Sequence, residues 1–203
     1  MHFNTLHARV LAALSCLSFP TMALPTDHHN PVENMIPRQF TAPDGTPSTV
    51  YVNRNLNFIS SPDSTASTKL SRRTVQFTPG TRNDYCSETT PDETFGSDAP
   101  LAADCLAIKD YMETIRGHYT VSPGDFINKS GWAVIASSGT CSFGVKFQLA
   151  ADTKQVVIGT NDVHFYINGY ARDARGGKIQ AVGTISCNND GQLLLLFWGM
   201  IHS

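Results

Sequence analysis

Hydrophobic and polar residues alternate most clearly between positions 139 and 149 of the chain. One face of this stretch is apolar and the other small or polar: Cys141, Phe143, Val145, Phe147 and Leu149 against Ser142, Gly144, Lys146 and Gln148. A period of two residues is typical of a half-buried β-strand. Because the first inward position is Cys141, we expect this strand to be the centre of the sheet and to be linked covalently to another element.

A helix is expected just before this strand, over about 101–115. Its apolar stripe has helical spacing and consists of Leu101, Cys105, Ile108, Met112 and Ile115. The sequence Ser97-Asp98-Ala99-Pro100 predicts a capped start with proline in the first turn, and Gly117 predicts the end. Since Cys105 lies on the apolar stripe, its sulfur is expected to face the sheet.

A second helix and further strands complete the predicted elements. The helix begins at Thr160 or Asn161 and continues to about Ala174. The other strands are expected at 119–121, 132–136, 154–158, 178–187 and 193–201, with a hairpin turn at 188–191. This order predicts an α+β fold, with two helices packed on one face of a mainly antiparallel sheet in a two-layer sandwich.

The N-terminal residues resemble a secretory signal. His7 and Arg9 precede an apolar run of about ten residues, too short to span a bilayer, which needs roughly 20. Pro20 follows, and Thr21-Met22-Ala23 has small residues at the positions that signal peptidase requires. We therefore predict a signal peptide over 1–23 and a secreted, extracellular protein. Cys16 would be removed with the signal.

Residues 24–73 have a different composition, with six prolines and a polar stretch at 60–68. Such a segment buries too little apolar surface to offset its ordering entropy, so disorder is expected. It ends at Arg72-Arg73, a dibasic pair typical of sites cut by Golgi subtilisin-type processing proteases. The segment is thus predicted to be a pro-peptide, or alternatively a flexible tail, and 74–203 a single disulfide-bonded domain.

Charge and composition narrow the possible partners. The chain is 41% hydrophobic and 16% charged, with a formal net charge of −2. Residues 74–203 contain 9 Lys and Arg against 13 Asp and Glu, a net charge of −4, and acids gather in their first third. This balance argues against nucleic-acid binding by phosphate neutralisation and against attraction to anionic membranes.

Four cysteines remain after signal removal, and in a secreted domain they predict two disulfides with three possible pairings. We favour Cys105–Cys141, from the first helix to the central strand, and Cys86–Cys187. The loops of about 36 and about 100 residues would stabilise the fold by about 3.8 and about 4.7 kcal/mol in the chain-entropy model. Zinc binding is the alternative, but the chain has no CxxC pair, so no metal or other cofactor is expected.

These residues carry a family resemblance over about 80–203. Its elements are Cys86, Ala103-Asp104-Cys105-Leu106, Gly139-Thr140-Cys141-Ser142-Phe143-Gly144-Val145, Gly183-Thr184-Ile185-Ser186-Cys187 and Trp198-Gly199-Met200-Ile201. The chain resembles the fungal secreted effector family of necrosis-inducing factors. The resemblance implies a small, cysteine-bonded effector of a plant-pathogenic fungus that provokes host cell death, related to modules attached to chitinases resembling killer toxins. The family has no agreed active site, so only the four cysteines carry over, as disulfide formers. A more distant similarity is to small fungal killer toxins.

Candidate catalytic residues are few. The strongest set is Glu113, Arg116 and His118, which could serve a secreted ribonuclease as acid, base and phosphate-binding cation. His118 also fits a structural role beside a helix end, and Glu113 with Arg116 fits an ordinary surface pair. His164 and His202 are interpreted as structural or exposed. We predict that the protein is not an enzyme and assign no catalytic residue.

Binding is the favoured class of function. Trp132 and Trp198 could stack on sugars or a partner, although both are expected in the core. The loops 122–130 and 150–155 are the predicted contact surfaces, and Asn128 begins an N-glycosylation sequon. The sequence thus predicts a monomeric effector that engages an extracellular or plasma-membrane target. The alternatives are an antimicrobial, killer-toxin-like protein and a small ribonuclease-like hydrolase.

Overall fold

The computed structural model describes residues 35–53, 75–87, 91–122, 131–147, 155–189 and 191–203. The strands of this part are β1 (Met35–Thr41), β2 (Pro47–Asn53), β3 (Gln76–Pro79), β4 (Asp92–Thr94), β5 (Gly117–Val121), β6 (Ala133–Ser138), β7 (Cys141–Phe147), β8 (Val156–Gly159), β9 (Gln180–Asn189) and β10 (Gln192–His202). The helices are α1 (Ala102–Thr114), α2 (Thr160–Tyr170) and the short 3-10 helix η3 (Ala171–Asp173). The predicted α+β class is confirmed.

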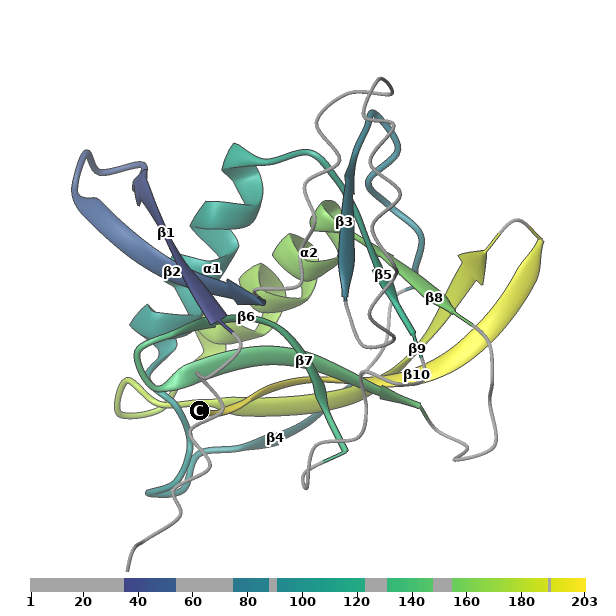
Figure 1. Ribbon diagram of the computed structural model, residues 1–203. Helices are drawn as coiled ribbons and strands as arrows, with labels where there is room; N and C mark the ends of the chain where they lie inside the picture. The colour runs from purple at the N-terminus through teal and green to yellow at the C-terminus, as the bar shows by residue number, and fades with distance from the viewer. Residues whose placement is uncertain (1–34, 54–74, 88–90, 123–130, 148–154, 190) are drawn as a thin grey trace, which may run out of the picture.

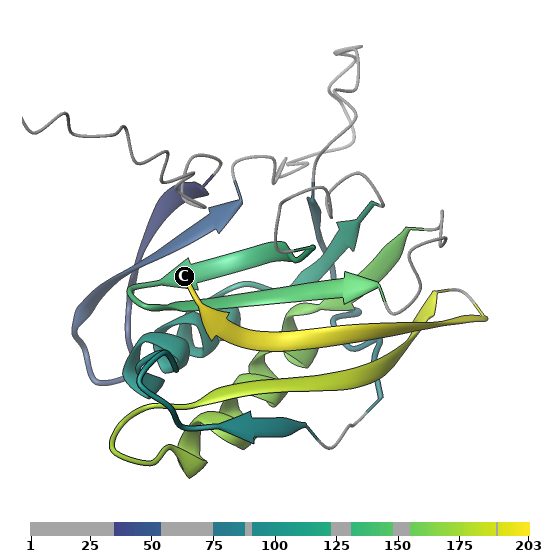
Figure 2. The ribbon, with the colours of Figure 1, turned by 90° about the horizontal axis from the view of Figure 1, so that it is seen from below.

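The larger sheet contains seven strands in the order β1-β2-β6-β7-β10-β9-β4, and every neighbouring pair is antiparallel. β7 is the fourth strand of the seven, so the alternating stretch is the sheet's centre, as predicted. Figure 2 shows the strands side by side, with the β1–β2 hairpin at one end of the sheet and β4 at the other.

Both helices lie on the same side of this sheet (Figure 1). The predicted apolar stripe of α1 is buried at Cys105, Ile108 and Met112. On α2, Val163 and Ile167 are fully buried. The helices therefore cover one face of the sheet, and the hydrophobic core lies between the helices and the sheet. This is the two-layer arrangement predicted from the sequence. Neither helix of the described residues has the length and apolar character that a membrane crossing needs.

The start of α1 differs from the prediction. Ser97 and Asp98 precede the helix and hydrogen-bond each other, while Leu101 occupies the N-cap position without a side-chain cap. A contact from the turn between β6 and β7 supports the helix start instead, because the Leu101 N–H donates to Thr140 Oγ1 at 2.8 Å. Long-range packing has thus taken over a role that local sequence assigned to the capping motif.

A second sheet, β3-β5-β8, was not separated from the first in the sequence interpretation. Its strands are antiparallel, and β8 leads directly into α2 through Gly159. Phe77 of β3 and Tyr119 of β5 are buried side by side, with ring centroids 5.0 Å apart. This small sheet fixes the point at which α2 begins.

The expectation of disorder over 24–73 is wrong for residues 35–53. These residues form the β1–β2 hairpin, with seven paired positions from Met35↔Asn53 to Thr41↔Pro47. Val50 and Val52 of this hairpin are fully buried. The apolar surface that this segment lacks is supplied by the rest of the sheet, since β2 pairs with β6. The predicted signal peptide, the dibasic pair Arg72-Arg73 and the sequon at Asn128 lie outside the described residues.

Both predicted disulfides are present. Cys86 is bonded to Cys187 with Cα atoms 4.0 Å apart, and Cys105 is bonded to Cys141 with Cα atoms 5.2 Å apart. The second bond joins α1 to β7, as predicted from the apolar stripe of the helix and from the alternating pattern of the strand. Because all four sulfurs are consumed in disulfides, these cysteines cannot serve as the zinc ligands of the alternative reading.

Candidate binding site at the start of α2

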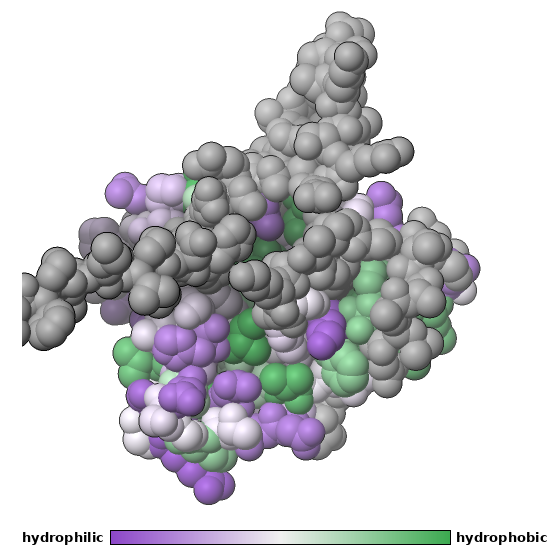
Figure 3. Space-filling view, turned by 60° about the horizontal axis from the view of Figure 1, so that its bottom comes forward, coloured by the Kyte–Doolittle hydropathy of each residue, from purple (hydrophilic) through white to green (hydrophobic). Residues whose placement is uncertain are grey.

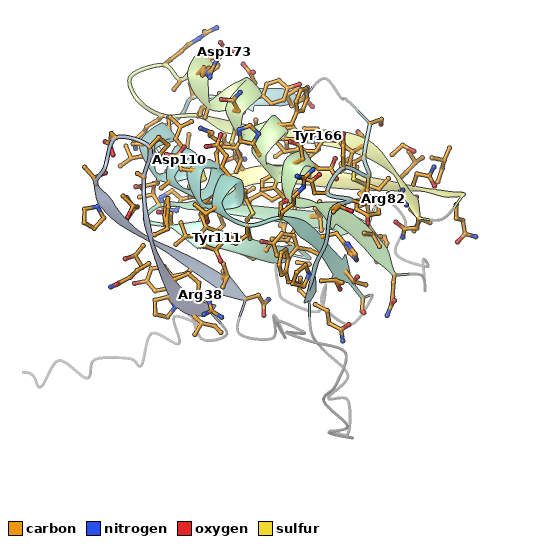
Figure 4. The ribbon with its side chains drawn as sticks, turned by 90° about the horizontal axis from the view of Figure 1, so that it is seen from above. Arg38, Arg82, Asp110, Tyr111, Tyr166 and Asp173 are labelled. Carbon is orange, nitrogen blue, oxygen red and sulfur yellow. A yellow bond between two sulfur atoms is a disulfide. The ribbon has the colours of Figure 1, made fainter. Side chains whose placement is uncertain are left out.

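A pocket of about 330 Å³ lies beside the first turn of α2 and the Cys86–Cys187 disulfide. Its lining comes from two segments far apart in the sequence: Asp84, Cys86 and Ser87 from the chain before α1, and Asn161, Asp162, Phe165 and Tyr166 from α2. Tyr166 is labelled on α2 in Figure 4. The disulfide fixes the first segment to β9, so the pocket has one covalently held wall and one helical wall.

Asp162 holds the two walls together. Its Oδ2 accepts hydrogen bonds from the backbone N–H groups of Gly159, at 2.7 Å, and Tyr85, at 3.0 Å. Its Oδ1 accepts from the backbone N–H of Cys86 at 3.2 Å. The carboxylate therefore satisfies a donor at the N-terminus of its own helix and two donors of the opposite wall. Asp162 is only 2% exposed, so these bonds form in a largely dry environment.

Asp84 makes this group a carboxyl pair. Burial, together with the side-chain hydrogen bond that protonated Asp162 donates to Asp84, raises the pKa of Asp162 from 3.8 to about 7, against the opposing effect of the backbone N–H donors. A hydrogen bond between two carboxyl groups requires a shared proton, because two carboxylates are both acceptors. The geometry of the wall is therefore linked to pH between weakly acidic and neutral conditions.

The aromatic side of the pocket combines a buried ring with an exposed one. The Tyr166 hydroxyl donates to the Ser87 carbonyl oxygen at 2.5 Å, and its ring stacks on the fully buried Trp198, with centroids 4.8 Å apart. Phe165 is 43% exposed at the same pocket. Asn161 is also exposed and lies four residues earlier, so the two side chains are neighbours on one helix face. An aromatic face and an amide are thus presented on a rigid support.

The proposed ribonuclease trio is not brought together as one acid–base set. Glu113 Oε1 lies 2.9 Å from His164 Nε2 on α2 and 3.2 Å from Lys109 Nζ. Arg116 Nε donates to the carbonyl oxygen of Thr81 at 3.2 Å. The His118 imidazole makes a different contact: its Nδ1 lies 3.1 Å from the hydroxyl oxygen of Tyr85. Each member therefore takes part in a separate contact that links two elements. His202, the remaining histidine considered, is exposed near the C-terminus.

The two tryptophans occupy opposite sides of the large sheet. Trp198 is in the core, as predicted, between Phe143 and Tyr166. Trp132 is half-buried and lies across Gly144 and Gly199: its ring would be 3.0 Å from a Cβ added at Gly199. The two glycines leave room for this indole on the outer face. Figure 3, which brings the underside forward, shows hydrophobic residues lying among hydrophilic ones.

Comparison with known proteins agrees with the family resemblance. Residues 85–187 match the Hce2 family, whose description is "Pathogen effector; putative necrosis-inducing factor". The matched range covers just over half of the chain and runs between two cysteines of the pattern. The chain belongs to the Hce2 family of pathogen effectors. Its membership and its two disulfides fit a secreted protein. No curated protein matches the chain.

Every lining residue of the pocket except Asp84 lies within the Hce2 range, but Asp162, which holds the two walls together, was missed by the sequence interpretation. Asp84 was not distinguished from the other acids in the first third of 74–203, and Asp162 was not singled out. The available signal was the position of Asp162 at the third residue of the predicted helix, where an acidic side chain can bond back to the N-cap N–H. The loops 122–130 and 150–155, predicted as contact surfaces, lie almost entirely outside the described residues.

Proposed function

We propose that this Hce2 protein is a secreted fungal effector that induces necrosis or modulates defence in a plant host, without catalysis, by binding an extracellular or cell-surface target. The observation that carries the proposal is the exposed pair Asn161 and Phe165 on the disulfide-held pocket. A rigid aromatic surface with a hydrogen-bonding group beside it gives binding energy at little cost in ordering. The partner group that it fits has an apolar face and a hydrogen-bonding edge.

The state of Asp162 favours binding over catalysis. Both of its oxygens accept backbone N–H groups, so its carboxyl group is used to hold the pocket wall. A general acid or base must reach the reacting group of a substrate. The exposed side chains of the pocket, Asn161 and Phe165, are suited to contact a ligand rather than to transfer a proton at neutral pH.

The proposal is tested by infiltrating plant leaf tissue with the purified, oxidised secreted chain and measuring electrolyte leakage. The hairpin 35–53 belongs to the sheet, so the secreted chain is used whole rather than from residue 74. Reduced and alkylated protein is the first control. We expect leakage from the folded protein. Phe165→Ser removes the exposed aromatic ring and should lower the potency at least tenfold. Serine is chosen because its helix propensity is similar to that of phenylalanine, so the helix itself should be little affected.

The matched control is Leu193→Ser, which removes another exposed apolar side chain, on β10 and outside the pocket lining. It is expected to retain full potency. Equal potency of Phe165→Ser and wild type, with both folded by circular dichroism, would refute the pocket as the contact surface. Inhibition of fungal growth without leakage from leaves would instead support the antimicrobial alternative. RNA cleavage that is lost in His118→Ala would contradict the non-catalytic reading.

A further inference from the structure

The β1–β2 hairpin occupies one edge of β6 and pairs with it over a short length. β2 and β6 are in register at Tyr51↔Ser137 and Val52↔Ala136. Asn53 Nδ2 adds a hydrogen bond to the Val134 carbonyl oxygen at 3.3 Å. On its other side β6 pairs with β7 from Ala133↔Val145 to Ser138↔Cys141. The edge of β6 covered by the hairpin is thus bonded over a shorter length than the edge that faces the sheet centre.

The hairpin also contributes side chains to the hydrophobic core and packs against α1. Val50 and Val52 are fully buried, and the Phe40 ring packs edge-on against Tyr111 of α1, with centroids 5.7 Å apart. Figure 4 shows the hairpin, with Arg38 labelled, on the side of α1 that carries Tyr111. The surface that the hairpin covers therefore has two parts, the edge of β6 and an apolar strip beside Tyr111.

No disulfide ties the hairpin to the rest of the sheet. Residues 35–53 contain no cysteine, and both disulfides join residues beyond position 85. The matched Hce2 range also begins only at residue 85. Between the hairpin and β3 lies the predicted processing site Arg72-Arg73. Because the connection is covalent, it maintains an effective concentration on the order of millimolar, which is lost when the connection is cut.

We infer that the hairpin is a releasable cover of the β6 edge, and that the uncovered edge binds an extended segment of a target protein. Hydrolysis of the peptide bond after Arg73 by a dibasic-specific protease consumes one water and leaves a carboxylate at Arg73 and an ammonium group at Thr74. Two effects then favour release of the hairpin. It is no longer covalently connected to the domain, and an isolated two-stranded hairpin is at best marginally stable in water. This inference goes beyond the proposed function and does not depend on the pocket.

β2 indicates the chemistry of the incoming segment. Its sequence Pro-Ser-Thr-Val-Tyr-Val-Asn has no charged residue, and its two inward residues are valines at alternate positions. A strand added to a sheet edge gains affinity from main-chain hydrogen bonds and selectivity from alternate side chains. The expected occupant is therefore an uncharged extended segment that runs antiparallel to β6 and carries small β-branched residues two apart.

The test begins with the full secreted chain and a dibasic-specific protease. After complete cleavage, size-exclusion chromatography at about 1 µM is expected to separate the fragment ending at Arg73 from the fragment starting at Thr74, because the tether no longer supplies effective concentration. The variant Arg72→Gln/Arg73→Gln is the uncut control. A labelled peptide with the sequence of residues 46–53 is then added to each protein and its fluorescence anisotropy is measured.

The peptide is expected to bind the cleaved, separated domain and to show no binding to the uncut control. The same peptide with serine at the positions of Val50 and Val52 should bind at least tenfold more weakly. Co-elution of the two fragments would overturn the inference, as would resistance of the folded chain to the protease or unfolding of the released domain. Equal binding of the two peptides, or dimerisation of the released domain through the same edge, would overturn the assigned occupant.

Discussion

The hairpin 35–53 and the domain core around β7 belong to one sheet, yet they are held in it by different means. β7 is bonded to a strand on each side and to α1 through Cys105–Cys141. Cys86–Cys187 fixes the chain before α1 to β9. The hairpin has buried valines but no disulfide, and within the described sheet it borders one strand, β6. A single continuous sheet can therefore contain a covalently held part and a part that opens separately.

This difference bears on how the effector is built. Local opening free energies in a folded protein range from near zero to the global value, and they follow the density of buried contacts. The pocket lies in the stapled part, where a binding surface benefits from rigidity. The β6 edge lies under the less firmly held part, where release of the hairpin is an advantage. The predictions below perturb one part and ask whether the other responds.

Loss of either disulfide is expected to have the largest effect. The double variants Cys86→Ala/Cys187→Ala and Cys105→Ala/Cys141→Ala should lose about 4.7 and about 3.8 kcal/mol of unfolding free energy in the chain-entropy model, measured by urea denaturation. Cys141→Ala alone should lower the secreted yield and protease resistance more than any single polar substitution. Wild-type yield and resistance from Cys141→Ala would contradict the role of β7 as the stapled centre.

Asp162→Ala should give the next largest effect, about 3 kcal/mol, because it leaves the backbone N–H groups of Tyr85, Cys86 and Gly159 without their acceptor. The same denaturation experiment measures it. Asp173→Ala, at an exposed position of η3, is the matched control and should change stability by no more than about 0.5 kcal/mol. Similar losses in the two variants would show that Asp162 does not join the pocket walls.

The carboxyl pair predicts a pH dependence of stability. Burial and the hydrogen bond from protonated Asp162 to Asp84 raise the pKa of Asp162 from 3.8 to about 7, so the folded state binds the proton more tightly than the unfolded state. The resulting stabilisation is present at acidic pH and is lost as pH rises through about 7. Unfolding free energy should fall by about 2–3 kcal/mol from pH 5 to pH 8 because of this pair.

Asp84→Asn isolates the contribution of the pair, since the amide can donate to Asp162 without a shared proton. The pH dependence of its unfolding free energy should be flatter than that of wild type over the same range. An unchanged slope would show that another group causes the dependence.

A substitution in the hairpin is expected to have the smallest effect on the global free energy of unfolding. Val52→Ala removes buried apolar surface and should weaken hairpin docking by about 1–2 kcal/mol, with little change in the unfolding of the core. Hydrogen exchange by mass spectrometry should show faster exchange in 35–53 alone. Tyr51→Val, on the outward side of the same strand, is the control. Faster exchange throughout the sheet in Val52→Ala would mean that the hairpin and core unfold together.

The sequence was most informative where structure depends on local periodicity. The alternation at Cys141–Phe147 and the stripe through Cys105 and Ile108 predicted both the elements and the facing sulfurs. The hairpin could not be predicted in this way because Val52 obtains its burial from β6, more than 80 residues later. Burial that depends on such a distant strand cannot be predicted from the local pattern, and the prolines around the hairpin favoured its interpretation as a disordered segment.

The candidate site was less predictable than the fold for a related physical reason. The cysteine that borders it, Cys86, was paired correctly, but the role of Asp162 depends on backbone donors at Tyr85 and Cys86, 77 and 76 residues away. An aspartate near a helix start is common. Only tertiary packing buries this one, raises its pKa and lets it hydrogen-bond both walls of the pocket. The dispersal of Glu113, Arg116 and His118 is likewise set by the packing of α1 against α2 and by the position of Tyr85.

Native-state hydrogen exchange on the full secreted chain tests most directly whether one sheet contains two separately opening parts. Opening free energies are compared between the amides of β1–β2 and those of β6, β7 and β10. We predict that the hairpin amides exchange through an opening of clearly lower free energy, which does not change when Cys105–Cys141 is removed. Equal opening free energies in the hairpin and in β7, falling together when that disulfide is removed, would contradict the account.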